Sequence, residues 1–479
     1  MLFLPYFNYL TKNKTIITPA SDASIGSFRS KNISFDLKHN LGFNVDYEHI
    51  FKKDNAKLII NAHTTLYDYR RNQRVDSDYF LGDNSYFENN AFKTRSDQDT
   101  QIFTSQVDYV LPIGESGTFE TGVKLSNVKT ESGLVQKNII GNSEIIDPDN
   151  SDTFDYDENV YAGYINYNRN GEKWNYNFGV RIEQTSVDGR SMSLPKTNSQ
   201  DYLEWFPTAS IKYAASEKTD IYINYKRSIQ RPNYSNLNPF KFFLNDNTIV
   251  TGNPELQPIF IDHAWIGISL NNKHTFEFYY QINDGKIFEL PIQDNVNNII
   301  SYTPINFSST KELGFDYSTY FDLYDSWNVS FLTSMYYTRD KGNFNNTLVE
   351  IDKWANYSKL TNSITFLKDK SLVTDFTVYY ISENIQGFQS VGTRILTELT
   401  VKKTILNGHG ILSLAINDFL NDQDFLVRTE YLDQKSSIFS NLDNRYVRVG
   451  FRYKFGNVKL EAEDVDLSKE ERERLQVRN

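Results

Sequence analysis

The chain has no cysteine, which removes disulfides, thiolate catalysis and cysteine-based zinc sites from consideration. Only 6 histidines are scattered along its 479 residues, so a histidine-based metal site is also disfavoured. No run of about 18 apolar residues occurs, which excludes a helical membrane span. With 12 Pro and 23 Gly the chain is neither collagen-like nor of low complexity. Its net charge of -11 argues against nucleic acid as a partner.

Motifs of the common catalytic sites are missing as well. The sequence has no Gly-x-Ser-x-Gly elbow, no phosphate-binding loop and no His-Glu-x-x-His pair. Carboxylate pairs are too frequent at this composition to indicate acid–base catalysis. We therefore expect no enzyme activity, no cofactor and no catalytic or metal-ligating residues.

Aromatic residues are abundant, with 32 Tyr, 34 Phe and 5 Trp making 15% of the chain. Many of them alternate with polar residues at the period of a β-strand. Trp174, Tyr176 and Phe178, for example, are separated by Asn175 and Asn177. Such alternation places one face of a strand in an apolar medium and the other in a polar one.

About 17 segments show this pattern, and several exceed the length of ordinary soluble strands. Long alternating strands are typical of a transmembrane barrel, so we predict an all-β, antiparallel outer-membrane β-barrel located in the cell outer membrane. The predicted segments are 31–51, 56–70, 99–112, 117–131, 153–169, 172–187, 201–214, 219–231, 258–271, 274–290, 298–323, 326–339, 349–368, 371–383, 391–406, 409–430 and 436–455.

The connections between these segments alternate between short turns and longer links, as they do in outer-membrane barrels with short periplasmic turns and long extracellular loops. The short turns are Lys52–Asn55, Ile113–Ser116, Asn170–Gly171, Ala215–Lys218, Asn272–Lys273, Leu323–Asp325, Asp369–Lys370 and Asn407–Gly408. The long links include Arg71–Gln98, Glu131–Asp152, Asp188–Gln200 and Pro232–Gln257.

An odd strand count is unusual for bacterial barrels, which normally have an even number. Either Leu2–Leu10 supplies an eighteenth strand, or the front of a larger barrel is missing; the second alternative is favoured, because the N-terminus does not resemble a signal peptide. The predicted organisation is an N-terminal remnant or extracellular loop segment at 1–30, the barrel at 31–455, and a charged periplasmic tail at 456–479.

Two stretches carry a family resemblance. Residues 202–258 contain Arg231-Pro232, the sequence LNPF at Leu237–Phe240 and the sequence GNPELQP at Gly252–Pro258. Residues 410–425 and the closing VRVGFRYKFGN are the second stretch. Both resemble the barrel of TonB-dependent receptors, and the similarity spans about residues 31–457.

That resemblance implies a barrel of about 22 strands with a plugged lumen. It implies the barrel portion of an outer-membrane receptor that imports a siderophore, sugar or similar nutrient. The implied partners are outer-membrane lipid, the barrel assembly machinery, an unidentified small-molecule ligand, and a TonB-type energy-coupling complex reached through a plug that this chain does not show. The alternative is a plug-less structural or adhesive barrel, or a truncated product without active transport. A third hypothesis, a soluble β-rich glycan-binding protein or enzyme, requires the apolar faces to pack against each other.

The link Pro232–Gln257 is the main candidate for ligand or plug contact. Its candidate residues are Arg231, Asn238, Phe240 and Asn253. The alternative is that the Pro, Gly and Asn residues only shape a long loop, because Pro fixes φ and Gly or Asn accepts left-handed geometry.

Near the end of the barrel, Gly450, Tyr453 and Phe455 resemble the signal read by the barrel assembly machinery. The alternative is an ordinary strand end, because alternation alone produces the aromatics.

Three further features have ordinary explanations. The acidic run 147–158 imitates a calcium loop, but Asp152 stands where such a loop needs glycine. The tryptophans are expected as interfacial girdle residues rather than sugar-stacking platforms. The inward-facing charges are expected to solvate a lumen; they are Arg181, Glu183, Glu312, Arg394, Glu398 and Lys402.

Overall fold

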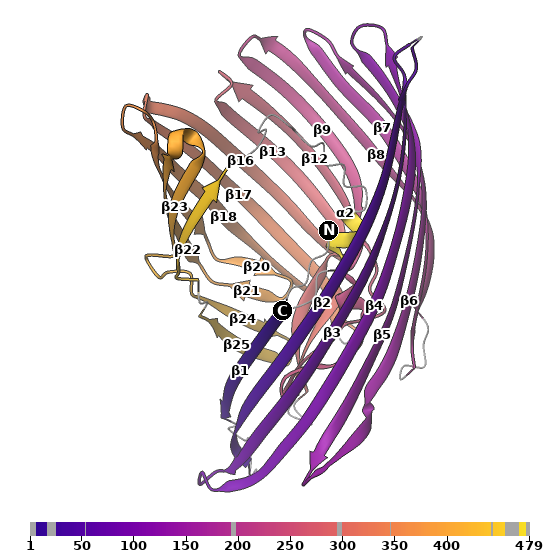
Figure 1. The fold of residues 1–479 in the computed structure, drawn as a ribbon, viewed down its shortest axis with the longest axis vertical. Coiled ribbons are helices and arrows are strands. Elements are labelled where there is room, and N and C mark those ends of the chain that lie inside the picture. Colours follow the sequence, from indigo (N-terminus) through magenta and orange to yellow (C-terminus); the bar gives the residue numbers. More distant parts are fainter. Residues whose placement is uncertain are drawn as a thin grey trace.

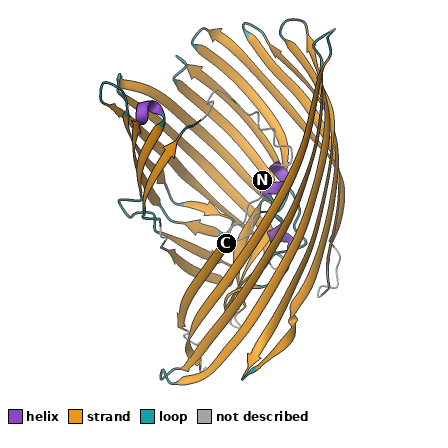
Figure 2. Ribbon diagram, in the orientation of Figure 1, coloured by secondary structure: helices purple, strands orange, loops and turns teal. Residues whose placement is uncertain are grey.

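The structure is a computed structural model that describes residues 6–16, 25–52, 54–192, 198–294, 299–344, 346–441, 444–455 and 469–475. Almost all of this part of the chain is β-strand, as Figure 2 shows. An 18-stranded antiparallel sheet curls around a central space (Figure 1). Within the described ranges, no helix has the length and apolar character needed to cross a membrane.

Each strand of the large sheet pairs with the next strand of that sheet along the chain, so that the sheet is one continuous meander. In order, its strands are β1 (Tyr6–Ile16), β2 (Ile25–Ile50), β3 (Lys57–Leu81), β4 (Tyr86–Ile113), β5 (Gly117–Ile140), β6 (Ser143–Asn170), β7 (Trp174–Ser191), β8 (Asn198–Ser216), β9 (Thr219–Gln230), β12 (Ile259–Leu270), β13 (His274–Asp284), β16 (Ser309–Tyr324), β17 (Trp327–Phe344), β18 (Thr347–Phe366), β19 (Leu372–Ile381), β22 (Arg394–Ile405), β23 (Gly410–Asn417) and β26 (Val447–Tyr453).

Each predicted segment overlaps one of these strands, and the prediction of a large antiparallel barrel is confirmed. An eighteenth strand, β1 at Tyr6–Ile16, is also described; it overlaps Leu2–Leu10, which was the less favoured alternative for such a strand. It pairs with β2 over its whole length. In the described part of the chain the two end strands, β1 and β26, are not paired with each other.

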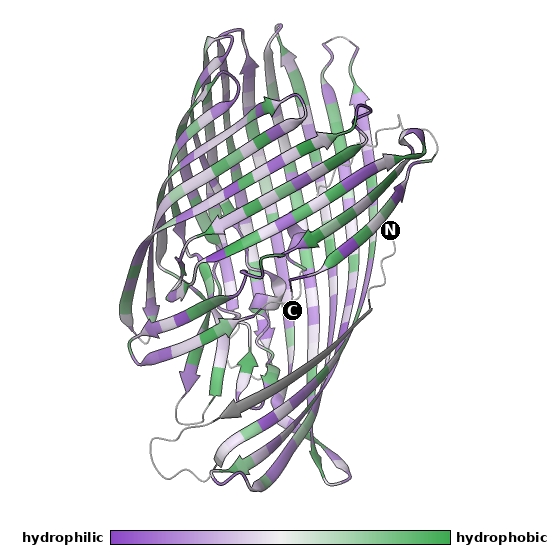
Figure 3. Ribbon diagram, turned by 90° about the vertical axis from the view of Figure 1, so that its left-hand side faces the viewer, coloured by the Kyte–Doolittle hydropathy of each residue, from purple (hydrophilic) through white to green (hydrophobic). Residues whose placement is uncertain are grey.

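The two faces of the sheet differ in polarity, as the alternation predicts. On β2, Phe43 and Val45 are exposed on the outer face, whereas Ser34 and Asp36 are buried on the inner face. Figure 3 shows hydrophobic and hydrophilic residues alternating along the strands. An exposed apolar outer face around a polar interior is the arrangement that a lipid bilayer requires.

Three of the five tryptophans, Trp174, Trp205 and Trp354, are exposed on the outer face of the sheet. Trp174 begins β7 beside a short turn and packs against Tyr213, with ring centroids 4.6 Å apart. Trp205 and Trp354 lie further along their strands and are 54% and 59% exposed. The girdle interpretation fits these outer-face residues, but Trp265 faces inward and stacks on His263 with ring centroids 4.6 Å apart.

Tyrosine rings brace the inner face where a neighbouring strand carries glycine. The ring of Tyr222 covers Gly267, where an added Cβ would collide with it. The Tyr222 hydroxyl then donates to Oε1 of Glu277 at 2.9 Å. Tyr279 covers Gly314 in the same way and donates to Glu312 at 2.8 Å. Glycine is therefore required at these positions by close approach and not by a turn.

Two predicted long links are instead extended hairpins. Residues 71–98 continue β3 and β4 and turn only at Gly82–Ser85, and 131–152 continue β5 and β6. Strands β2–β6 therefore reach further than the rest at the lower end of Figure 1. The prediction of long loops at 71–98 and 131–152 was wrong because strands that extend beyond the membrane keep their backbone pairing without needing an apolar face.

Two small four-stranded sheets fold from the remaining long connections. The first contains β10 (Phe242–Asn245), β11 (Thr248–Val250), β15 (Ile299–Asn306) and β14 (Ile287–Asp294). The second contains β20 (Asn384–Gln386), β21 (Gln389–Val391), β24 (Phe425–Tyr431) and β25 (Gln434–Ser440). Gln434 joins them by accepting a hydrogen bond from the backbone N–H of Gln293 at 2.6 Å.

Candidate functional site

The link Pro232–Gln257, hereafter the pocket loop, folds against the inner face of the barrel. It contains the short helix α1 (Tyr234–Leu237) and then β10 and β11. The side-chain amides of Asn32 and Gln73 both donate to the backbone oxygen of Phe243, at 2.8 and 2.7 Å. Since Asn32 lies on β2 and Gln73 on β3, these bonds tie the pocket loop to the barrel wall.

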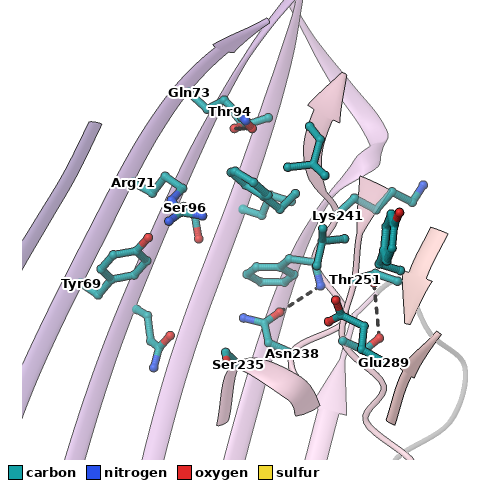
Figure 4. Close-up of a pocket in the computed structure, with 18 residues that line it drawn as sticks. Tyr69, Arg71, Gln73, Thr94, Ser96, Ser235, Asn238, Lys241, Thr251 and Glu289 are labelled. Atoms are coloured by element: carbon teal, nitrogen blue, oxygen red, sulfur yellow. Dashed lines mark hydrogen bonds between the residues drawn. The ribbon is translucent and has the colours of Figure 1, made fainter. Parts of the chain in front are cut away.

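A cavity of about 450 Å³ lies between the pocket loop and the inner faces of β3, β4 and β5. Figure 4 shows side chains from the wall and from the pocket loop pointing toward this space. The wall contributes Tyr69, Arg71, Gln73, Thr94, Ser96, Gln98 and Leu134. The pocket loop contributes Ser235, Asn238, Phe240, Lys241, Phe242, Leu244, Val250, Thr251 and Gly252, and Glu289 and Tyr302 complete the lining.

The charges around this cavity are largely compensated. The Arg71 guanidinium donates to both carboxylate oxygens of Asp36, at 2.8 and 2.7 Å. Tyr69 donates to the same carboxylate at 2.9 Å, and the Arg71 guanidinium lies 4.5 Å from the ring centroid of Phe242. Lys241 and Glu289 add one charge of each sign to the lining. The cavity therefore offers aromatic faces and neutral hydrogen-bonding groups rather than a strong net charge.

Two of the four predicted site residues, Asn238 and Phe240, line the cavity. The Asn238 side-chain oxygen accepts the backbone N–H of Phe240 at 3.0 Å, which fixes the turn that presents the Phe240 ring. The backbone oxygen of Asn238 accepts the N–H of Gly252 at 3.0 Å. An added Cβ at Gly252 would collide with that same oxygen, so the glycine of the family-like motif permits a close crossing of two loop segments.

Asn253 shapes the loop rather than the cavity. Its side-chain amide donates to the backbone oxygen of Pro304 at 3.2 Å, and its side-chain oxygen accepts the N–H of Glu255 at 2.9 Å. These bonds join the pocket loop to β15, and the ordinary explanation is sufficient for this residue.

Arg231 does not line the cavity; it lies in a buried group of charges beside it. It donates to Glu183 at 2.7 Å, to Thr185 at 3.0 Å and to Glu470 at 2.9 Å. Glu470 belongs to the charged tail, whose described part, 469–475, lies on the inner face of the sheet and includes helix α2 (Lys469–Glu473). The rest of the tail lies outside the described residues.

Arg474 from the tail makes the second ion pair of this group, with Glu158 at 2.6 Å. Burial disfavours the charged form of Arg474, but Glu158 holds its pKa well above the usual range. Burial also raises the pKa of the neighbouring Tyr234, which therefore stays un-ionised. Among the predicted lumen charges, Arg181 and Glu183 belong to this group, with Arg181 donating to Glu183 at 2.5 Å.

Six of the seven wall residues of the cavity, which sequence reasoning missed, lie on β3 and β4, and the seventh, Leu134, lies on β5. Tyr69, Arg71 and Gln73 keep the strand period, and that was the available signal. The polarity of the residues after position 70 made that segment resemble a loop.

The acidic run 147–158 lies within β6, but the pairing of β6 with β5 is interrupted between Asp147 and Asp152. In the described part of the chain, no group of three or more acidic or histidine side chains is placed to hold a metal ion. The Asp147 carboxylate already accepts hydrogen bonds from Asn138 and Asn150, at 3.0 and 3.1 Å.

The three predicted assembly-signal residues lie at the end of the sheet. Gly450 is on β26 opposite Ser413, and Tyr453 ends that strand on the outer face. Phe455 follows the strand and is 86% exposed. Recognition of these residues by the assembly machinery stays a prediction.

The fold is that of solved outer-membrane receptor barrels. The ferric citrate transporter FecA, in its unliganded form, matches with a TM-score of 0.54 and 10% identity over 95% of this chain and 76% of that one. The siderophore receptor PiuA from Acinetobacter baumannii matches with a TM-score of 0.52 and 12% identity over 94% and 77%. The ferripyoverdine receptor of Pseudomonas aeruginosa matches with a TM-score of 0.51 and 12% identity over 94% and 70%.

No sequence among the curated proteins is significantly similar to this chain. A family model does match, that of the outer membrane protein beta-barrel family, and it covers residues 49–453. The match includes the pocket loop and all strands from β3 to β26. With the fold, this localises the protein to the outer membrane. The chain belongs to the outer membrane protein beta-barrel family.

Proposed function

We propose that this protein is the barrel of an outer-membrane receptor that imports a small ligand, and that the ligand binds in the cavity beneath the pocket loop. The observation that carries the proposal is the construction of the cavity. One side is the rigid wall at Tyr69–Gln73 and 94–98, and the other is the loop with the family-like motifs. A site between a fixed wall and a separate loop suits a receptor that must both hold and release its ligand.

The lining favours a ligand without strong net charge. The charge of Arg71 is compensated by Asp36, and the charges of Lys241 and Glu289 are of opposite sign. Aromatic rings at Phe240 and Tyr302 can stack on flat or ring-shaped groups, while neighbouring amides and hydroxyls form hydrogen bonds. A neutral, polyhydroxylated ligand such as an oligosaccharide therefore suits the cavity better than a highly charged chelate.

Import would further require an energy source. The resemblance to TonB-dependent receptors implies a TonB-type complex acting through a plug, and we infer the same route for this barrel. Outer-membrane lipid and the barrel assembly machinery are its other proposed partners.

Calorimetric titration of the refolded protein in detergent tests the site. The probes are a neutral oligosaccharide, ferric citrate and an iron-loaded hydroxamate siderophore. We expect the neutral probe to bind best, and Phe240→Ala to weaken binding about tenfold or more, because it removes a buried ring contact. Leu420→Ala, at an exposed loop position outside the cavity, is the matched control and should bind like the parent.

Tighter binding of ferric citrate than of the sugar would overturn the proposed ligand class. Failure of every probe to bind a folded barrel would favour a structural or adhesive barrel instead.

A further inference from the structure

The tail residues 469–475 contact both the barrel wall and the start of the pocket loop. In Figure 1, helix α2 lies within the curve of the sheet. Arg474 and Glu158 form a two-pronged ion pair at 2.6 and 3.0 Å, and their side chains are only 6% and 3% exposed. A buried charge is stable only when it is paired, and Arg474 is the partner that neutralises Glu158 on the barrel wall.

The same arginine holds the pocket loop. Its Nε donates to the backbone oxygen of Pro232 at 2.9 Å, and its own backbone oxygen accepts the N–H of Tyr234 at 3.2 Å. The guanidinium lies 4.4 Å from the ring centroid of Tyr234. Arg474 thus joins the first residues of the pocket loop to β6.

Further contacts reinforce this arrangement. Glu470 accepts a hydrogen bond from Arg231, the residue before the pocket loop, at 2.9 Å, and Glu471 pairs with Lys124 of β5 at 2.9 Å. Leu475 packs into one buried apolar cluster with pocket-loop residues and wall residues, including Tyr234, Leu237, Leu256, Tyr69 and Val187. Tyr69 also lines the cavity, so the cluster and the cavity share a wall.

We propose that residues 469–475 are a latch that holds the pocket loop against the lumen wall and so controls access to the cavity. This proposal rests on the proposed function in one respect only, which is that the cavity binds a ligand. An isolated helix as short as α2 is unstable in water, so its order depends on these contacts with the wall. Loss of Arg474 would free both the tail and the start of the pocket loop.

Thiol labelling can test the latch, because the chain has no cysteine of its own. Val187→Cys places a probe on β7 beneath the latch, where the native side chain is 6% exposed. In the otherwise unchanged protein we expect slow labelling by a charged, membrane-impermeant maleimide. Adding Arg474→Ala should raise the labelling rate at least about tenfold, because the rate follows the population of the opened state.

Glu473→Gln is the matched control, since its side chain lies on the same helix but is exposed. It should label at the rate of the Val187→Cys parent. Heat-modifiable migration on gels verifies that each variant is folded. If Arg474→Ala fails to fold, the pair Arg474→Met with Glu158→Gln removes the ion pair without leaving a buried charge, and it should also label faster.

Unchanged labelling in the folded latch variants, or an equal increase in Glu473→Gln, would overturn the latch. Neither result depends on a ligand, so the failure of the latch is distinguishable from the failure of the proposed ligand site.

Discussion

Replacing Phe178 with arginine should destabilise the folded barrel, because the side chain lies near the centre of the apolar band. On β7, Phe178 is midway between Trp174 and Ile182, and Ile182 pairs with Trp205 on β8. With a rise of about 3.3 Å per residue and a strand tilt near 45°, Phe178 lies about 9 Å from either tryptophan level. Its side chain is 45% exposed on the outer face.

At this depth an outward-facing arginine costs about 2–4 kcal/mol in a transmembrane barrel. A loss near 3 kcal/mol lowers the folding equilibrium constant roughly 100-fold. Asn177→Arg is the control on the same strand, since Asn177 faces the lumen opposite Asn168 and Ser210. We expect it to change the free energy of unfolding by about 0.5 kcal/mol or less.

Reversible denaturant unfolding in lipid vesicles measures both changes, followed by intrinsic fluorescence and by gel migration. Equal penalties for Phe178→Arg and Asn177→Arg would refute the reasoning, because they would indicate two equivalent packed faces. Lack of any penalty for Phe178→Arg would show that the outer face is not in contact with lipid.

Three other outcomes follow from the described contacts. Arg71→Ala leaves the buried Asp36 carboxylate, whose side chain is 1% exposed, without its arginine, and should lower the free energy of unfolding by about 3–5 kcal/mol. Adding Asp36→Asn should recover part of this loss, and no recovery would contradict a pairing effect. Gly267→Ala should cost about 1–3 kcal/mol by collision with the Tyr222 ring, and Tyr222→Ala in the same chain should relieve it; additive losses would exclude the collision. Deleting the charged tail should leave membrane insertion intact, as measured by protease protection. Deletion from Gly450 onward removes half of β26 and should abolish insertion. Loss of insertion on removing the tail alone would show that the barrel needs the tail.

The sequence by itself determined the strands and their two faces, because side-chain alternation is a local property of extended backbone. Several short turns could also be predicted from the local sequence. Asn272 and Asn407 have φ of 54° and 53°, and Gly408 has φ of 90°, in the left-handed region that asparagine and glycine tolerate best. The family-like loop was singled out as the main candidate for ligand or plug contact, which stays a prediction, and two of its four candidate residues line the cavity.

Only the tertiary structure decided how far the strands run and what the loops meet. The extensions of β3–β6 are mostly polar, with only a few apolar residues such as Val75 and Phe92, so the sequence did not show where the strand pairing ends. The cavity joins residues near position 70 with others near 240 and 300, which only the folding of the loop against the curved wall brings together. Glu158 and Arg474 are 316 residues apart, and a charge in the sequence does not reveal which distant charge it meets. Alternation is set by each residue and its neighbours, whereas these pairings depend on the curvature of the whole sheet. The local pattern therefore predicted the barrel strands but not the cavity or the ion pairs inside the barrel.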